Sequence, residues 1–113
     1  MYKCAILVRS DLKMSKGKVI AQSGHAIVNT MCNSSQSKIN SWMECGETIV
    51  TLKINNIKTM QTIYEIAQRK NVYSHIVTDA GHTEIAPGTQ TVCVLGPDTE
   101  TKINKLISQL KLY

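Results

Sequence analysis

The chain begins with an unbroken run of apolar residues, 4–8, that includes the β-branched residues Ile6 and Val8. A strand with one face in water alternates between apolar and polar residues, whereas a continuous apolar run is typical of a strand buried on both faces. Such strands occur in sheets that helices cover on both sides. We therefore expect an α/β fold with helices on each face of a mostly parallel sheet.

Four strands and four helices are predicted along the chain. The β-rich segments 4–8, 48–54, 73–78 and 89–95 are expected as strands, and segments 15–32, 38–44, 57–70 and 98–110 as helices. The loop 79–88 is too short for a parallel crossover, so the last two strands should be antiparallel. We expect one domain, residues 1–113, with three α/β/α layers around a mixed, mostly parallel four-stranded sheet.

Residues with capping preferences mark the predicted helix boundaries. Ser15 fits the N-cap of the first helix, and the pair at 55–56 fits that of the third. Pro97 and Asp98 are expected to end the last strand and to cap the last helix.

The composition is that of a small globular protein. No stretch of eighteen apolar residues is present, which argues against a membrane-spanning helix. The first residues do not resemble a signal peptide, and we expect a cytoplasmic protein. The cysteines are well separated and are expected in the core as reduced thiols, without a metal, a redox site or a cofactor: Cys4, Cys32, Cys45 and Cys93.

The net charge of +5 is unevenly distributed. Residues 1–43 contain six basic side chains and one acidic one, whereas residues 44–113 contain seven of each. This asymmetry is compatible with a solvated surface and equally with a site for a polyanion such as RNA.

The first predicted helix has a polar stripe. At about 100° per residue, its members lie within roughly 60° of one another: Lys18, Gln22, His25 and Asn29. This stripe has two interpretations. It is either the solvent-exposed face of a surface helix, with no function, or the wall of a cleft that binds a substrate. The apolar residues on the other faces are expected to point toward the core: Val19, Ile20, Ile27 and Met31.

Asp79 directly follows the third predicted strand, in the sequence Asp-Ala-Gly. Ligands of open α/β sheets bind outside the carboxyl ends of the strands, where Arg9 and Lys18 are also expected. Asp79 and Gly81 could alternatively form a plain turn.

Two other kinds of site are disfavoured. A metal site from His75, Asp79 and His82 follows no established ligand spacing. A serine nucleophile would require a Gly-x-Ser-x-Gly elbow, which is absent from the sequence.

Three stretches of the chain together resemble the archaeal and eukaryotic type of peptidyl-tRNA hydrolase. They lie in order and cover most of the chain: residues 8–26, which contain Arg-Ser-Asp-Leu-Lys-Met-Ser-Lys-Gly-Lys, residues 79–85 (Asp-Ala-Gly-His-Thr-Glu-Ile), and residues 87–97, from Pro-Gly-Thr to Leu-Gly-Pro.

This resemblance implies a domain that hydrolyses the ester bond of peptidyl-tRNA, releasing peptide and tRNA, and that forms homodimers. The family's active-site cluster matches Lys18, Gln22, Asp79, Thr83 and Thr91, and His25 matches a histidine on the same helix face. The residues expected to contact tRNA phosphates are Arg9, Lys13, Lys16 and His82, which stands where the family often has arginine.

We expect Asp79 to activate or orient water and Lys18 to stabilise the oxyanion or protonate the leaving oxygen. Two alternatives remain open at this stage. The first is a non-catalytic module with this fold that binds tRNA or protein. The second is a generic esterase, which would cleave small activated esters without RNA.

Overall fold

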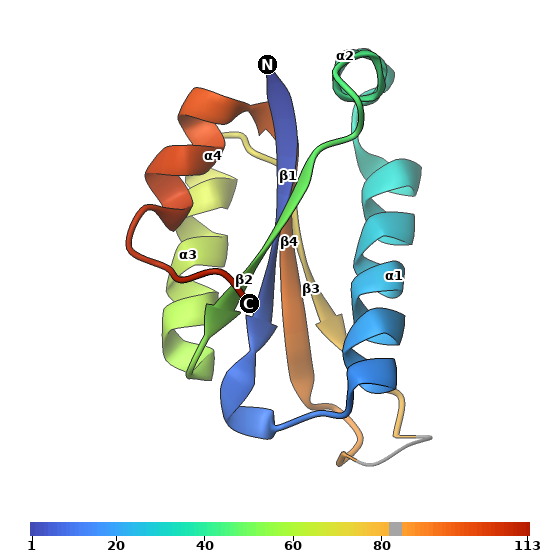
Figure 1. The fold of residues 1–113 in the computed structure, drawn as a ribbon, viewed down its shortest axis with the longest axis vertical. Coiled ribbons are helices and arrows are strands. Elements are labelled where there is room, and N and C mark those ends of the chain that lie inside the picture. Colours follow the sequence, from blue (N-terminus) through green and yellow to red (C-terminus); the bar gives the residue numbers. More distant parts are fainter. Residues whose placement is uncertain (82–84) are drawn as a thin grey trace.

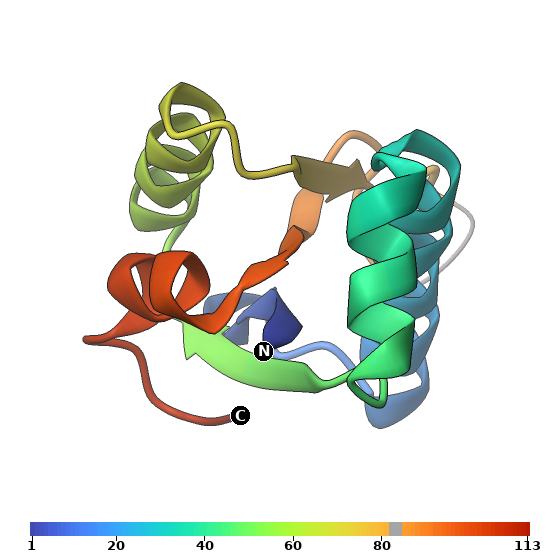
Figure 2. The same ribbon diagram turned by 90° about the horizontal axis from the view of Figure 1, so that it is seen from above.

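The computed structural model describes residues 1–81 and 85–113, which form a four-stranded sheet with helices on both faces (Figure 1). Helices α1 (Lys16–Asn33) and α2 (Gln36–Glu44) cover one face. Helices α3 (Ile57–Arg69) and α4 (Glu100–Ile107) cover the other (Figure 2). The predicted three-layer arrangement is therefore confirmed. The strands are β1 (Tyr2–Arg9), β2 (Ile49–Ile54), β3 (Ser74–Thr78) and β4 (Gln90–Thr99), and a short 3-10 helix, η1, spans Ser10–Leu12.

The expectation of a mostly parallel sheet is wrong. The strand order is β2-β1-β4-β3, and of the neighbouring pairs in the described sheet only β1–β2 is parallel. The physical reason is the place of β4. Strands β1, β2 and β3 all run in the same direction, but β4 runs the opposite way and is hydrogen-bonded between β1 and β3. The antiparallel pairing of the last two strands is confirmed.

β1 is buried on both faces, as its apolar run predicts. Ala5 and Leu7 pack into the core under α3 and α4, whereas Ile6 and Val8 pack into the core under α1. Because β1, β2 and β3 share a direction, their carboxyl ends lie at one edge of the sheet, and the start of β4 lies there too.

β4 is longer than predicted. It continues past Pro97 to Thr99, where it pairs with the start of β1, and Thr99 rather than Asp98 caps α4. Proline lacks a backbone N–H and is tolerated at irregularities in a ladder. Pro97 lies next to such a site, because the register between β1 and β4 shifts between Lys3 and Ala5.

The orientation of α1 also differs from the prediction. Ile20 and Met31 were expected in the core, but they are 71% and 42% exposed. Val19 is buried as predicted, and Ile27 packs partly buried against the same core. The other buried residues of the helix are small or polar: Lys18, Gln22, Ala26 and Thr30. No helix in the described residues is long and apolar enough to cross a membrane.

Candidate active site

The first turn of α1 is set by the predicted N-cap. The Ser15 hydroxyl accepts a hydrogen bond from the Lys18 backbone N–H at 3.2 Å. Such a cap satisfies a helix donor that has no partner within the helix. It fixes the start of α1, so that Lys18 and, one turn later, Gln22 face the sheet and are buried.

Lys18 and Asp79 form a buried ion pair, in which Lys18 Nζ donates to Asp79 Oδ1. The two side chains are only 8% and 3% exposed. Asp79 Oδ2 accepts a hydrogen bond from the Gly81 N–H at 2.8 Å. The Asp79 main chain is also held, since its N–H donates to Thr89 O at 2.8 Å and its C=O accepts from Gly88 N at 2.9 Å. The structure thus brings together two residues 61 positions apart at the predicted sheet edge.

Gln22 and Thr91 form a second buried contact beside the ion pair. Gln22 Nε2 donates to Thr91 Oγ1 at 2.7 Å, and the Thr91 hydroxyl donates to Val77 O at 3.3 Å. The proton of the Thr91 hydroxyl is therefore directed to the backbone of β3, and the oxygen of that hydroxyl to the Gln22 amide. This arrangement fixes Gln22 relative to both β3 and β4.

Lys18, Gln22 and Asp79 border a cavity of about 690 Å³ between α1 and β3. Lys18, Gln22, His25 and Asn29 line one wall, which confirms that the polar stripe of α1 faces a cleft. Residues 75–80 line the other wall. His25 is exposed, and Thr91 is buried behind the cavity. The candidate residues His82 and Thr83 lie outside the described residues.

A family model described as peptidyl-tRNA hydrolase PTH2 matches residues 2–113. The chain belongs to this family. It is 36% identical over 113 residues to the peptidyl-tRNA hydrolase of Methanocaldococcus jannaschii, an alignment that covers 97% of this chain and 98% of the relative. It is 39% identical over 110 residues to that of Methanothermobacter thermautotrophicus, with the same coverage.

The resemblance inferred from three stretches of sequence is therefore confirmed over nearly the whole chain. The PTH2 protein is an ester hydrolase, and its reaction is the hydrolysis of peptidyl-tRNA. This assignment favours the hydrolase over the non-catalytic module and the generic esterase.

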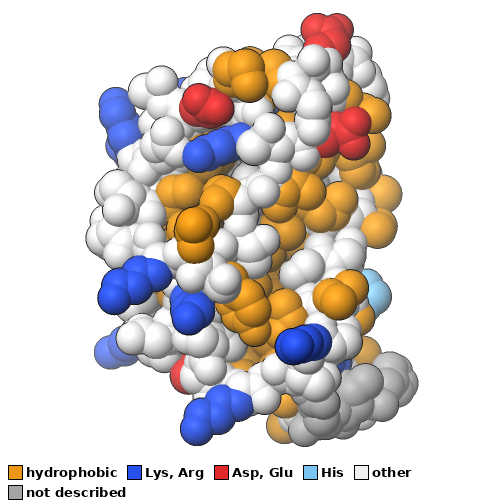
Figure 3. All heavy atoms as spheres, viewed as in Figure 1, with side chains coloured by type: hydrophobic (Ala, Val, Ile, Leu, Met, Phe, Trp, Pro, Cys, Tyr) orange, Lys and Arg blue, Asp and Glu red, His pale blue; other side chains and the backbone are white. Residues whose placement is uncertain are grey.

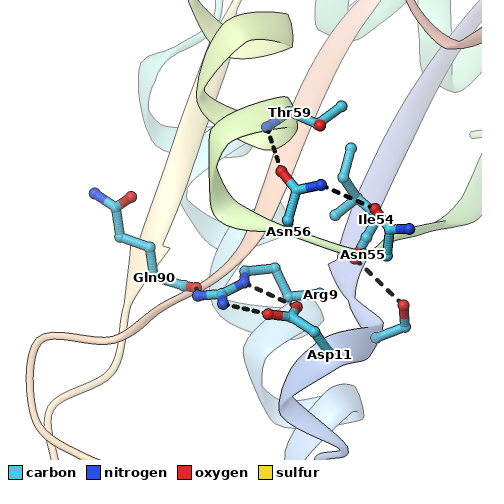
Figure 4. Close-up of polar contacts among 8 residues, drawn as sticks. Arg9, Asp11, Ile54, Asn55, Asn56, Thr59 and Gln90 are labelled. Atoms are coloured by element: carbon cyan, nitrogen blue, oxygen red, sulfur yellow. Dashed lines mark hydrogen bonds and ion pairs between the residues drawn. The ribbon is translucent and has the colours of Figure 1, made fainter.

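The basic side chains of this PTH2 protein differ in how they are held. The Arg9 guanidinium donates to the Asp11 carboxylate at 3.1 and 2.6 Å and to Gln90 O at 3.1 Å, so it ties the end of β1 to η1 and to β4 (Figure 4). Lys13 and Lys16 are exposed. Lys and Arg side chains gather over the lower half of the face shown in Figure 3, toward the carboxyl ends of β1 and β2.

Sequence reasoning missed part of this basic surface. A hollow of about 520 Å³ is lined by Arg9, Lys13, Lys53 and Tyr113, among others. The C-terminal tail lies antiparallel beside β2, with Lys53 N–H donating to Lys111 O at 2.8 Å. Lys53 and Lys111 are thus directly opposite, an arrangement that repels unless an anion lies nearby. Residues 44–113 contain as many acidic as basic side chains, so the charge of the sequence gives no sign of a basic site there. Only the fold shows that Lys53 and Lys111 lie together.

No group of three potential metal ligands among His, Cys, Asp and Glu occurs within the described parts of this PTH2 chain. The candidate set of His75, Asp79 and His82 includes a residue outside those parts.

Proposed function

We propose that the ester bond of peptidyl-tRNA is cleaved in the cleft between α1 and β3, at the Lys18–Asp79 pair. The observation that carries this proposal is a buried ion pair beside an open cavity of about 690 Å³. Buried charges are costly unless they are paired and hydrogen-bonded, and they concentrate at functional sites.

In the proposed reaction, a water molecule attacks the ester carbonyl carbon while Asp79 orients the water and accepts its proton. The carbonyl oxygen becomes an oxyanion, which Lys18 stabilises. An ammonium has three N–H donors, so Lys18 can hold Asp79 and the oxyanion at the same time. The bond from the carbonyl carbon to the ribose oxygen then breaks, and Lys18 protonates the leaving oxygen.

The remaining members of the predicted cluster have supporting roles in this proposal. Gln22, which lines the cavity, places the water and the carbonyl group, and Thr91 positions the Gln22 amide through their hydrogen bond. Thr83 is proposed to contribute a further hydrogen bond, and His25, on the cleft wall, to relay protons to solvent. The proposed reaction requires neither a cofactor nor a metal.

The tRNA phosphates are proposed to contact Arg9, Lys13, Lys16 and His82, and the enzyme is proposed to act in the cytoplasm. Lys13 and Lys16 follow the carboxyl end of β1, where they lie on the polypeptide between Arg9 and the catalytic Lys18. Phosphate contacts of this kind make affinity fall steeply as salt increases.

The enzyme is further proposed to be a homodimer that associates through the outer face of α1. This face exposes Ile20, Val28 and Met31, and hydrophobic side chains lie along the side formed by α1 and α2 (Figure 3). Gly24 lies in the middle of it, and a Cβ added there would meet nothing within 4 Å. Glycine in a helix interior costs about 1 kcal/mol relative to alanine. Close approach of a second copy would explain why glycine is used.

The proposed active site is tested by replacing both members of the ion pair, which avoids leaving one buried charge unpaired. The double variant Lys18→Met/Asp79→Asn should release peptide from N-acetyl-alanyl-tRNA about 10³-fold more slowly than the wild type. Circular dichroism checks that it folds. Lys102→Met, on the exposed side of α4, is the matched control and should retain full activity. A folded double variant with near-wild-type turnover would overturn the assignment.

A further inference from the structure

β3 is an edge strand, because the strand order β2-β1-β4-β3 gives it one neighbour within the described sheet. Its peptide groups alternate between β4 and the open side. Tyr73 O accepts a hydrogen bond from Gly96 N, and Asp79 N donates to Thr89 O, so the odd-numbered positions face β4. The peptide groups of Ile76 and Thr78 therefore point away from the sheet.

The open stretch of this edge has a defined beginning. Ser74 also points outward, but its C=O accepts a hydrogen bond from Gln68 Nε2 at 3.5 Å. The side chain of Gln68, in α3, therefore takes up the outward-pointing C=O of Ser74, so that Ser74 is not open to a further strand. Beyond it, Ile76 and Thr78 offer two N–H donors and two C=O acceptors immediately before Asp79.

The cavity follows this edge into the proposed active site. Successive side chains of a strand point to opposite faces of the sheet. The cavity nevertheless touches six consecutive residues, 75–80, so it runs along the edge of β3 and not over one face. Its other wall is the polar stripe of α1, which includes Lys18 and Gln22. A chain lying in the cavity beside β3 is therefore led to the ion pair.

We propose that the peptide part of peptidyl-tRNA adds to the open edge of β3 as an extra parallel strand. This inference rests on the proposed active site. Backbone hydrogen bonds recognise an extended peptide whatever its side chains, which suits a substrate whose peptide varies in sequence. The ester is at the C-terminus of the peptide, and the ion pair is at the carboxyl end of β3. Only a strand parallel to β3 brings its C-terminal carbonyl to Lys18 and Asp79.

The length of the open edge limits how much peptide is held. Ile76 and Thr78 can bond a parallel partner over about four residues, at a rise of about 3.3 Å per residue. Residues of the peptide farther from the ester lie beyond the Gln68–Ser74 contact. The peptide side chains point alternately to the two faces, and every second one is directed toward the α1 wall that includes His25 and Asn29.

The test is a backbone scan of the substrate with the wild-type enzyme. N-acetylated oligoalanyl-tRNAs should show a KM that falls with peptide length and levels off at about four residues. Within those residues, N-methylation of single amides should raise KM about fivefold at every second position, with little change in kcat. N-methylation of the sixth residue from the ester is the internal control and should have no effect. The proposal would be overturned if KM did not depend on peptide length. It would also be overturned if N-methylation raised KM without the alternation between one amide and the next.

A pair of variants tests the same edge from the enzyme side. Thr78→Pro removes an N–H that faces away from the sheet, a position where edge strands tolerate proline. It should abolish the dependence of KM on peptide length, whereas the matched Thr78→Ala should keep it, with both folds checked by circular dichroism. If Thr78→Pro does not fold, the length and N-methylation series measured with the wild-type enzyme is sufficient to test the proposal. Failure of the edge proposal is distinct from failure of the active site, because Lys18→Met/Asp79→Asn lowers turnover of N-acetyl-alanyl-tRNA as well as of longer substrates.

Discussion

Gln22 in α1 donates a hydrogen bond to the hydroxyl of Thr91 in β4 at 2.7 Å, and both side chains are buried. The two residues are 69 positions apart. Their bond holds the cleft-lining face of α1 against the sheet, one helical turn from Lys18. Gln22 and Thr91 therefore contribute both to the packing of α1 and to the geometry of the proposed active site.

Thr91→Val should lower kcat for N-acetyl-alanyl-tRNA by about tenfold, with a smaller effect on KM, because the Gln22 amide loses its fixed acceptor. Valine matches threonine in shape, so the change removes a hydroxyl without opening a cavity. Steady-state kinetics checks the result, and Thr101→Val, on the exposed side of α4, provides the control. Unchanged kcat would mean that the bond serves only to pack the helix.

The opposed lysines of β2 and the C-terminal tail should contribute to tRNA affinity. Lys53→Gln/Lys111→Gln should raise KM for peptidyl-tRNA and flatten the slope of log KM against log salt by about 1.5, because two phosphate contacts are lost. Lys102→Gln/Lys105→Gln removes the same charge from α4, on the opposite face of the sheet. Equal effects of the two double variants would assign the change to net charge and not to this surface.

The proposed dimer should be sensitive to charge on the outer face of α1. Ile20→Lys is expected to shift the mass measured by light scattering from that of two chains to that of one, because burial of an unpaired ammonium in an interface is costly. Leu112→Lys is the control, since Leu112 is similarly exposed, at 69%, but lies in the C-terminal tail. If Ile20→Lys leaves the mass unchanged, α1 is not the interface.

The two core thiols should make the protein less stable at high pH. Burial raises the pKa of Cys4 and of Cys93 to about 12, from an ordinary 9.0. Between these values the unfolded chain loses thiol protons that the folded chain keeps. The free energy of unfolding should therefore fall with rising pH by about 1.4 kcal/mol per pH unit for each thiol, and this thiol contribution is constant below pH 9.

Urea denaturation between pH 8 and 11 checks this expectation. Cys93→Ala should show a shallower decline than the wild type, whereas Cys32→Ala, at an exposed position, should decline in parallel with it. Parallel declines for all three proteins would contradict the role of the buried thiol.

The local pattern of the sequence determined much of the fold. The apolar run of β1 specified a strand buried on both faces, and Ser15 and Asn56 marked helix starts where their side chains do accept from backbone N–H groups. The helical spacing of Lys18 and Gln22 placed them on one face, and Asp79 followed a strand end. Each of these features depends on residues close in the chain, which is why the sequence was sufficient to predict them.

Only the tertiary structure decided which segments are neighbours. The insertion of β4 between β1 and β3 made β3 an edge strand, exposed the peptide groups of Ile76 and Thr78, and left one parallel pair in the described sheet. Packing between distant segments likewise left Ile20 exposed on the outer face of α1 and brought the C-terminal tail beside β2, with Lys53 opposite Lys111. Strand pairing and helix orientation depend on packing between distant segments, and the periodicity of a segment shows which faces it buries but not what it buries them against.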